Sequence, residues 1–97
     1  MKVNINSVHF KVDQKLESFL TNKIEKLSSK HNDMIGSEVT LKLENTDTPD
    51  NKITEIRLLL KGNDLFASKQ SKSFEEAADA AIDALKKQLE KHKKKTK

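Results

Sequence analysis

At 97 residues the chain has room for one domain, which we expect to span residues 1–97, and the absence of cysteine excludes disulfides and thiolate metal sites. No apolar run is long enough for a secretion signal or a membrane span, so we expect a cytoplasmic protein without membrane association. Nineteen basic and fifteen acidic residues give a net charge of +4, and four phenylalanines without tryptophan or tyrosine argue against a single-strand binder that stacks bases on aromatic side chains.

The alternation of apolar and polar residues predicts a first strand, and the spacing of later apolar residues predicts a first helix. Val3 and Ile5 alternate with polar residues, which is typical of a short strand with one buried face. From Asp13 onward the apolar residues recur at helical spacing, and Asp13 is a suitable N-cap, so we expect a helix that ends near Lys30. Its apolar positions are Leu16, Phe19, Leu20, Ile24 and Leu27.

Three further strands are expected in the middle of the chain. The segments 38–44 and 55–60 alternate apolar and polar residues, and the turn-forming segment 45–51 between them predicts an exposed loop. Gly62 and Asn63 are expected to form a two-residue turn that leads into a fourth strand over 64–70. That turn would place apolar residues opposite one another on both faces of the hairpin.

The predicted register contains one conflict. It pairs Leu60 with Leu65 and Leu58 with Ala67, but it also sets Lys69 opposite Ile56 on the face toward the core. We therefore expect Lys69 to lie near the end of the sheet and to extend its ammonium group outward.

The last element begins at the strongest local signal in the chain. Ser73 and Glu76 form a capping-box pattern, in which each side chain binds the other residue's backbone amide. Apolar residues then follow one helical face, and the helix is expected to continue into the lysine-rich end of the chain. Whether the tail over about 94–97 is ordered is left open. The apolar positions are Phe74, Ala78, Ala81, Ile82, Leu85 and Leu89.

The predicted order of elements is strand, helix, three strands, helix. A right-handed crossover through the first helix makes the first two strands parallel, and hairpins add the other two as antiparallel neighbours. Both helices have a single apolar face, so both should cover the same side of the sheet. The expected fold is an α+β two-layer domain of order β-α-β-β-β-α with a four-stranded mixed sheet.

Lysines collect on one flank of the first helix. Lys15, Lys23, Lys26 and Lys30 lie on the same side of the apolar stripe on a helical wheel, while Glu17 and other acidic residues lie elsewhere. Lys23 falls almost within the stripe. A lysine that covers core surface and one that contacts RNA are equally good interpretations of that position.

The second helix separates its charges along its length. Acidic residues in its first half complement the helix dipole, but that effect fades within about the last turn and does not explain a run of lysines at the other end. These lysines repel one another, and the phosphates of a duplex-like RNA would neutralise them. The run contains Lys86, Lys87, Lys91, Lys93, Lys94 and Lys95.

Other chemistry has little support in the sequence. His9, His31 and His92 are far apart and lack the spacing of a metal site, so no metal or cofactor is expected. With two glycines there is no Gly-rich phosphate loop, and no serine has a recognisable nucleophile motif. We therefore expect neither an enzyme nor a small-molecule substrate.

Several stretches together resemble the short form of the ribosome hibernation-promoting factors, a family of ribosome-associated translation inhibitors. They are VNI at 3–5, KIEKL at 23–27, LKLE at 41–44, LFAS at 65–68 and, most specifically, AIDALKKQLEKHK at 81–93. The resemblance implies a stress-response protein of dormant, stationary-phase cells. It would bind the small ribosomal subunit and its ribosomal RNA in the channel for messenger RNA and transfer RNA, and so block translation.

The same resemblance implies which residues contact RNA. Family contacts lie on both helices and carry over to Lys23, Lys26, Lys86, Lys87, Lys91 and Lys93. Lys30 and Lys94 are added from the helical wheel and the charge run. The acidic loop with Asp47 and Asp50 is assigned no RNA contact. Off the ribosome the protein should be a monomer, and whether it promotes ribosome dimers is left open.

Two alternatives come from other classes of protein. Helices beside a mainly antiparallel sheet also describe general double-stranded RNA-binding modules, which would bind isolated duplexes as tightly as ribosomes. A protein-interaction domain would instead use the open sheet face, where Leu59 and Phe66 are expected to be exposed.

Overall fold

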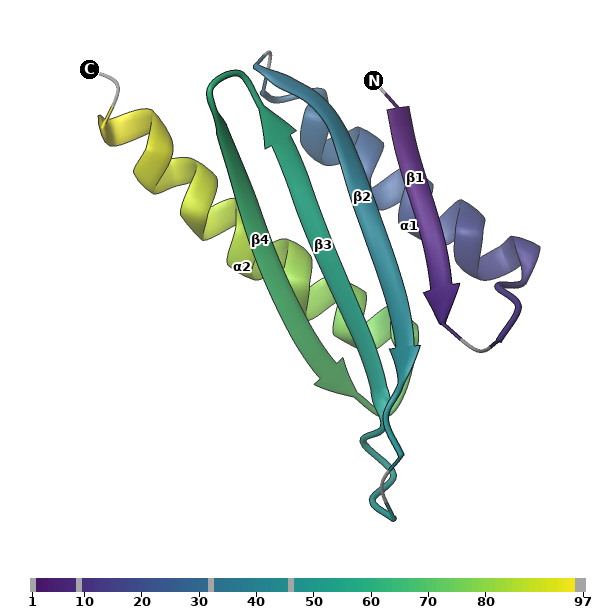
Figure 1. Cartoon of the computed structure of the whole chain (residues 1–97). Helices are drawn as coiled ribbons and strands as arrows, with labels where there is room; N and C mark the ends of the chain where they lie inside the picture. Colours follow the sequence, from purple (N-terminus) through teal and green to yellow (C-terminus); the bar gives the residue numbers. More distant parts are fainter. Residues whose placement is uncertain (1, 9, 32, 46, 96–97) are drawn as a thin grey trace.

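The elements follow the predicted order. The computed structural model describes residues 2–8, 10–31, 33–45 and 47–95, with side chains through Lys91. Its elements, shown in Figure 1, are β1 (Lys2–Val8), α1 (Gln14–Ser28), β2 (Met34–Leu43), β3 (Lys52–Leu60), β4 (Asn63–Ser71) and α2 (Phe74–Lys95). Each strand is longer than its alternating core pattern, and α2 continues into the terminal lysines as expected.

One mixed sheet of four strands forms the first layer, in the order β1-β2-β3-β4. β1 pairs with β2 in parallel, whereas the β2–β3 and β3–β4 pairs are antiparallel. Both helices lie on the same side of this sheet in Figure 1, and α2 packs mainly against β3 and β4. The predicted two-layer α+β fold is confirmed.

The turn between β3 and β4 differs from the prediction. Leu60 pairs with Asn63, so the turn residues are Lys61 and Gly62 rather than Gly62 and Asn63. Gly62 has a φ of 77°, which an L side chain adopts only with strain. The glycine therefore occupies the second turn position, and the expected pairing of Leu60 with Leu65 is wrong.

The correction shifts the pairing by two residues and so leaves each side chain on its predicted face. Leu65 pairs with Leu58, and Ala67 pairs with Ile56. Lys69 is opposite Thr54 and is exposed, so the predicted conflict with Ile56 does not arise. A register shift of two residues leaves each side chain on the same face of the sheet, because side chains alternate between the faces with a period of two along a strand.

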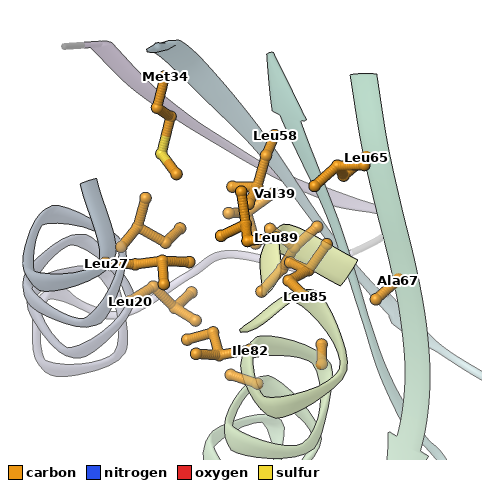
Figure 2. Packing of buried hydrophobic residues seen from close by; sticks show 14 of the residues in the cluster. Leu20, Leu27, Met34, Val39, Leu58, Leu65, Ala67, Ile82, Leu85 and Leu89 are labelled. Carbon is orange, nitrogen blue, oxygen red and sulfur yellow. The ribbon is translucent and has the colours of Figure 1, made fainter. Parts of the chain in front are cut away.

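A single apolar core fixes the helices on the sheet. Leu20 and Ile24 of α1, Val39 of β2, and Leu58 of β3 are fully buried, as is Leu85 of α2. Figure 2 shows such side chains from both helices and the sheet meeting in one layer. Because this packing sets the rotation of each helix, it also sets which polar residues face the space between the helices.

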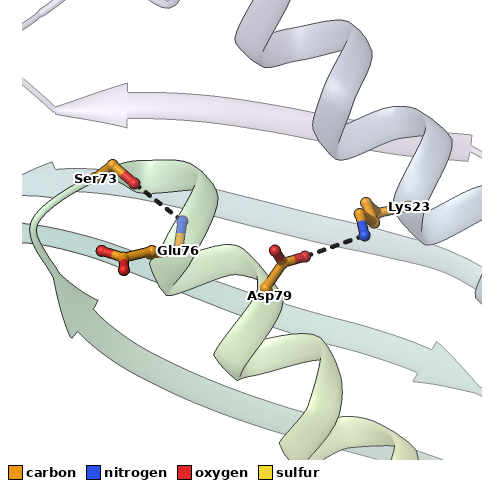
Figure 3. Close-up of polar contacts among 4 residues, drawn as sticks. All are labelled: Lys23, Ser73, Glu76 and Asp79. Atoms are coloured by element: carbon orange, nitrogen blue, oxygen red, sulfur yellow. Dashed lines mark hydrogen bonds and ion pairs between the residues drawn. The ribbon is translucent and has the colours of Figure 1, made fainter.

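Side-chain caps start both helices. The backbone amide of Leu16 donates to Asp13 Oδ1 at 2.7 Å, which confirms the predicted N-cap of α1. At α2 the amide of Glu76 donates to Ser73 Oγ at 3.1 Å (Figure 3). The Glu76 carboxylate accepts a hydrogen bond from Ser71 Oγ at 2.9 Å, not from the Ser73 amide that a reciprocal capping box would use.

The segment between β2 and β3 is the exposed loop that its composition predicts. Its described residues from 44 to 50 are exposed, and the amide of Glu44 donates to the carbonyl of Asn51 at 2.8 Å, which closes the base of the loop. Across the described residues, neither helix has a stretch that is apolar enough to cross a membrane.

Candidate nucleic-acid interface

A groove between the two helices gathers lysines from both of them. Its volume is about 380 Å³, and its floor is formed by one apolar residue from each helix. Four lysines and two aspartates supply the charged groups. The lining residues are Lys23, Lys26, Leu27, Lys30, Asp79, Ile82, Asp83 and Lys86.

The same sequence spacing builds both walls. On each helix the lining residues fall at i, i+3, i+4 and i+7, over 23–30 at one wall and 79–86 at the other. Residues at these intervals share one flank of a helix. Leu27 and Ile82 are buried, so the positions beside them on each helix must lie at the edge of the core. Core packing therefore turns the two charged flanks toward each other.

Lys23 is tied to the opposite helix. Its ammonium group points toward Asp79 of α2 (Figure 3). The Nζ atom lies 3.2 Å from Asp79 Oδ1 and 5.5 Å from the centre of the Phe19 ring. The residue is only partly exposed because its aliphatic stem lies at the edge of the core. Lys23 thus covers core surface, and its ammonium group is already paired with a carboxylate.

Lys30 and Lys86 are in a different position. Both lysines also line an adjoining hollow of about 300 Å³ with Leu27, His31 and Glu90. Within the described residues, no ion pair involves Lys30 or Lys86. These ammonium groups, one from each side of the groove, are the strongest candidates for binding phosphate.

Lys26 lies at the outer rim. It lines the groove and also a shallow hollow on the outside of α1 with Asn22, Glu25 and Ser29. No ion pair of Lys26 is found in the part of the chain that the structure describes. Its ammonium group can therefore meet a ligand from above the groove.

The other predicted lysines are placed elsewhere. Lys87 and Lys91 are exposed on α2 but do not line the groove, because they lie about 100° or more around the helix axis from Lys86. The side chains of Lys93 and Lys94 lie outside the described residues, although both belong to α2. Lys23, Lys26, Lys30 and Lys86 are the predicted residues that the groove brings together.

Two groove residues were missed by the sequence analysis. Asp79 and Asp83 were explained by the dipole of the second helix alone, yet both lie in the groove among the lysines. Their spacing from Lys86, seven and three residues, places them on the same flank of α2 and could have revealed this.

The helix-free face of the sheet has paired charges instead. Arg57 lies 3.9 Å from Glu38 and 3.8 Å from Asp64, and Lys42 lies 3.2 Å from Glu55. These contacts run between neighbouring strands. The face therefore offers little unpaired positive charge to a polyanion.

Of the two apolar residues expected to be exposed on that face, Phe66 is exposed as predicted and Leu59 is not. Phe66 is 45% exposed and has the Arg57 guanidinium 5.4 Å from its ring centre. Leu59 is only partly exposed, so its predicted exposure is wrong. It lies beside Gly36 of the neighbouring strand, where a Cβ would be 3.5 Å from Leu59 Cδ1. Phe66 and Leu59 thus form no broad apolar surface.

The described residues contain no group of three or more histidine, cysteine or acidic side chains that could hold a metal ion. The groove offers ammonium groups, carboxylates and a small apolar floor, an arrangement suited to binding an anion.

Comparisons with known proteins agree on one family. The model of the family described as "Sigma 54 modulation protein / S30EA ribosomal protein" matches residues 3–97. A ribosome hibernation promoting factor of Pseudomonas putida is 30% identical over 95 residues, which cover 98% of this chain and 89% of that protein.

Two solved structures share the fold. A ribosomal subunit interface protein from Coxiella burnetii superposes with a TM-score of 0.84 at 16% identity, covering 96% of this chain and 98% of that one. The N-terminal domain of Thermus thermophilus Protein Y superposes with a TM-score of 0.80 at 17% identity, covering 95% of this chain and 99% of that one. The match of the family model confirms the predicted resemblance, and the chain belongs to the sigma 54 modulation protein / S30EA ribosomal protein family.

Proposed function

We propose that this protein is a ribosome hibernation factor that binds the small ribosomal subunit in the channel for messenger RNA and transfer RNA and so inhibits translation in dormant cells. The observation that carries this proposal is the groove in which both helices present lysines, in a chain of a family whose relatives are named for ribosome hibernation and the subunit interface. As a ribosome-bound factor it would act in the cytoplasm.

The proposed mechanism is occupation of space. Lys26, Lys30 and Lys86 would approach phosphates of ribosomal RNA, while Lys87 and Lys91 extend the basic surface along the outer side of α2. The core fixes both helices to the sheet, so the domain would enter the channel as a rigid body. Inhibition then requires no bond to be made or broken and no cofactor.

Competition for the channel tests this proposal. Purified protein should sediment with small subunits, and saturating messenger RNA with a transfer RNA anticodon stem should displace it. In a cell-free system the protein should lower translation in proportion to the occupied subunits. Unchanged binding in the presence of both RNAs would refute the channel as the binding site.

Salt dependence tests the role of the lysines. With about five phosphate contacts, one for each of these lysines, the logarithm of the affinity should fall with the logarithm of salt concentration at a slope of roughly −4 to −5. A flat response would contradict electrostatic binding. Equal affinity for an isolated RNA duplex and for small subunits would favour the general RNA-binding module.

A protein-interaction domain makes a different prediction. Replacing Phe66 on the helix-free face with a polar residue should abolish ribosome association if that face is the contact surface. Under the proposed function the same variant keeps its affinity for small subunits, because the groove lies on the other side of the sheet.

A further inference from the structure

We propose that Asp79 and Asp83 determine RNA specificity by excluding phosphate from one half of the groove, and that Lys23 serves as the partner of Asp79 rather than as a phosphate ligand. This inference rests on the proposed function, because it assumes that the groove binds RNA. It assigns opposite roles to residues that line the same groove.

The groove is divided along its length. Asp79, Asp83 and Lys23 lie toward the first half of α2, and the Lys23 ammonium is 3.2 Å from Asp79. Lys30 and Lys86 lie toward the other end, where they continue into the adjoining hollow above Leu27. We call these the acidic half and the basic half of the groove.

A phosphate would meet different environments in the two halves. In the acidic half it would approach two carboxylates and the Lys23 ammonium group, whose charge Asp79 already offsets, while Lys26 lies at the outer rim. In the basic half it would approach Lys30 and Lys86, which have no ion-pair partner among the described residues, with a single carboxylate, Glu90, at the adjoining hollow. Repulsion between like charges is an effective way to reject a wrong partner.

This division favours a folded RNA surface over a regular duplex. A groove lined only by lysines would bind any polyanion, because attraction to phosphates is independent of sequence. A duplex carries phosphates at every step and would present them to both halves. A ribosomal RNA surface of the right shape can place phosphates in the basic half alone, and so avoids Asp79 and Asp83.

The first experiment compares two RNA targets. Affinities for a 20-base-pair RNA duplex and for purified small subunits are measured for the wild type and for Asp79→Asn, Asp83→Asn and the double variant. The double variant should bind the duplex roughly three to ten times more tightly, in line with the removal of two exposed carboxylates. Its affinity for small subunits should change less than about twofold.

Asp64→Asn is the matched control. It makes the same change in net charge and also removes a carboxylate that is paired with a cation, Arg57, but on the helix-free face. Its duplex affinity should stay close to that of the wild type. An equal gain for Asp64→Asn and Asp79→Asn would overturn the proposal, since the effect would then reflect net charge alone.

A double-mutant cycle tests the assignment of Lys23. In the wild type, Lys23→Gln should lower duplex affinity less than about twofold, because its ammonium is already paired. In the Asp79→Asn background the freed lysine should contribute a phosphate contact, so the salt slope should steepen by about 0.9 and Lys23→Gln should reverse this. A merely structural ion pair would change the melting temperature but not the salt slope.

The outcomes separate this inference from the proposed function. Wild-type binding to small subunits, with displacement by messenger RNA, tests the proposed function alone. That binding can hold while the ratio of small-subunit affinity to duplex affinity is the same in the wild type and the double variant. In that case the assignment of Asp79 and Asp83 is wrong. A lower ratio of small-subunit affinity to duplex affinity in Asp79→Asn, and lower still in the double variant, with no change in Asp64→Asn, supports it.

Discussion

Two buried hydroxyl groups in this protein have opposite environments. Thr54 is fully buried, and its Oγ1 donates a hydrogen bond to the carbonyl of Phe74 at 3.2 Å, which links β3 to the first turn of α2. Ser37 is 1% exposed, and within the described residues its hydroxyl has no hydrogen-bond partner. A hydrogen-bonded hydroxyl stabilises a core modestly, whereas one without a partner costs the free energy of its desolvation.

Replacing these residues should therefore shift stability in opposite directions. Thr54→Val keeps the shape of the side chain but loses the bond to Phe74, so the free energy of unfolding should fall by about 1 kcal/mol. Ser37→Ala removes a buried oxygen that has no hydrogen-bond partner among the described residues, so the free energy of unfolding should rise by about 1 kcal/mol. Urea denaturation of both variants checks this, and a loss of stability in Ser37→Ala would contradict it.

At the level of elements, the β3–β4 hairpin shows where local pattern is sufficient and where it is not. The alternation of apolar and polar residues assigned each side chain to its correct face of the sheet. The face depends only on whether a residue is at an odd or an even position along the strand. The turn was misplaced by one residue because Gly62 can serve at either central position of a two-residue turn. The pairing of Leu60 with Asn63 places Gly62 at the second of these positions, after Lys61.

Gly62→Ala should cost roughly 1 kcal/mol of unfolding free energy. A Cβ at Gly62 would have no atom within 4 Å, so the cost comes from the left-handed backbone and not from a steric clash. Lys61→Ala is the control at the neighbouring exposed position and should leave stability within about 0.5 kcal/mol of the wild type. Equal midpoints of thermal unfolding for both variants would show that the turn conformation carries no such strain.

The capping of α2 also divides into a predictable part and an unpredictable one. The bond from the Glu76 amide to Ser73 Oγ follows from local spacing. The Glu76 carboxylate binds Ser71 instead, and Ser71 reaches that position only because β4 ends beside the helix. Contacts within one turn can thus be read from sequence, whereas a competing partner from the preceding strand cannot.

For the whole molecule, the fold was predictable and the groove only in part. Periodicity gave the elements, and their single apolar faces gave the two layers. The helical wheel also placed Lys23, Lys26 and Lys30 on one flank, as observed. It could not show that Asp79 would lie opposite Lys23, because that depends on how two helices far apart in sequence pack on one sheet.

The lysines of α2 also show that sequence alone does not tell which residues line the groove. The resemblance treated Lys86, Lys87 and Lys91 alike, but in the structure only Lys86 of these three lines the groove. The other two lie on a different flank of the helix and are exposed. Their charge adds to the basic character of the molecule without entering the space between the helices. This difference permits a comparison in which the number of removed charges is constant.

The comparison pairs Lys30→Gln/Lys86→Gln with Lys87→Gln/Lys91→Gln. Each variant removes two positive charges from exposed lysines, so both lower the net charge equally. If the groove is the phosphate-binding site, the first variant should lose roughly tenfold or more in affinity for small subunits, and its salt slope should flatten by about 1.8. The second variant should lose markedly less, because its lysines act on RNA from outside the groove.

Filter binding or sedimentation at several salt concentrations measures both affinity and slope, and melting temperatures confirm that both variants are folded. Equal losses would mean that affinity follows net charge over the whole helix face, and the groove would then have no special role. A larger loss in Lys87→Gln/Lys91→Gln would move the RNA contact to the outer side of α2. A loss confined to Lys30→Gln/Lys86→Gln would instead support the binding of RNA phosphate between the helices, since both lysines line the groove and the adjoining hollow.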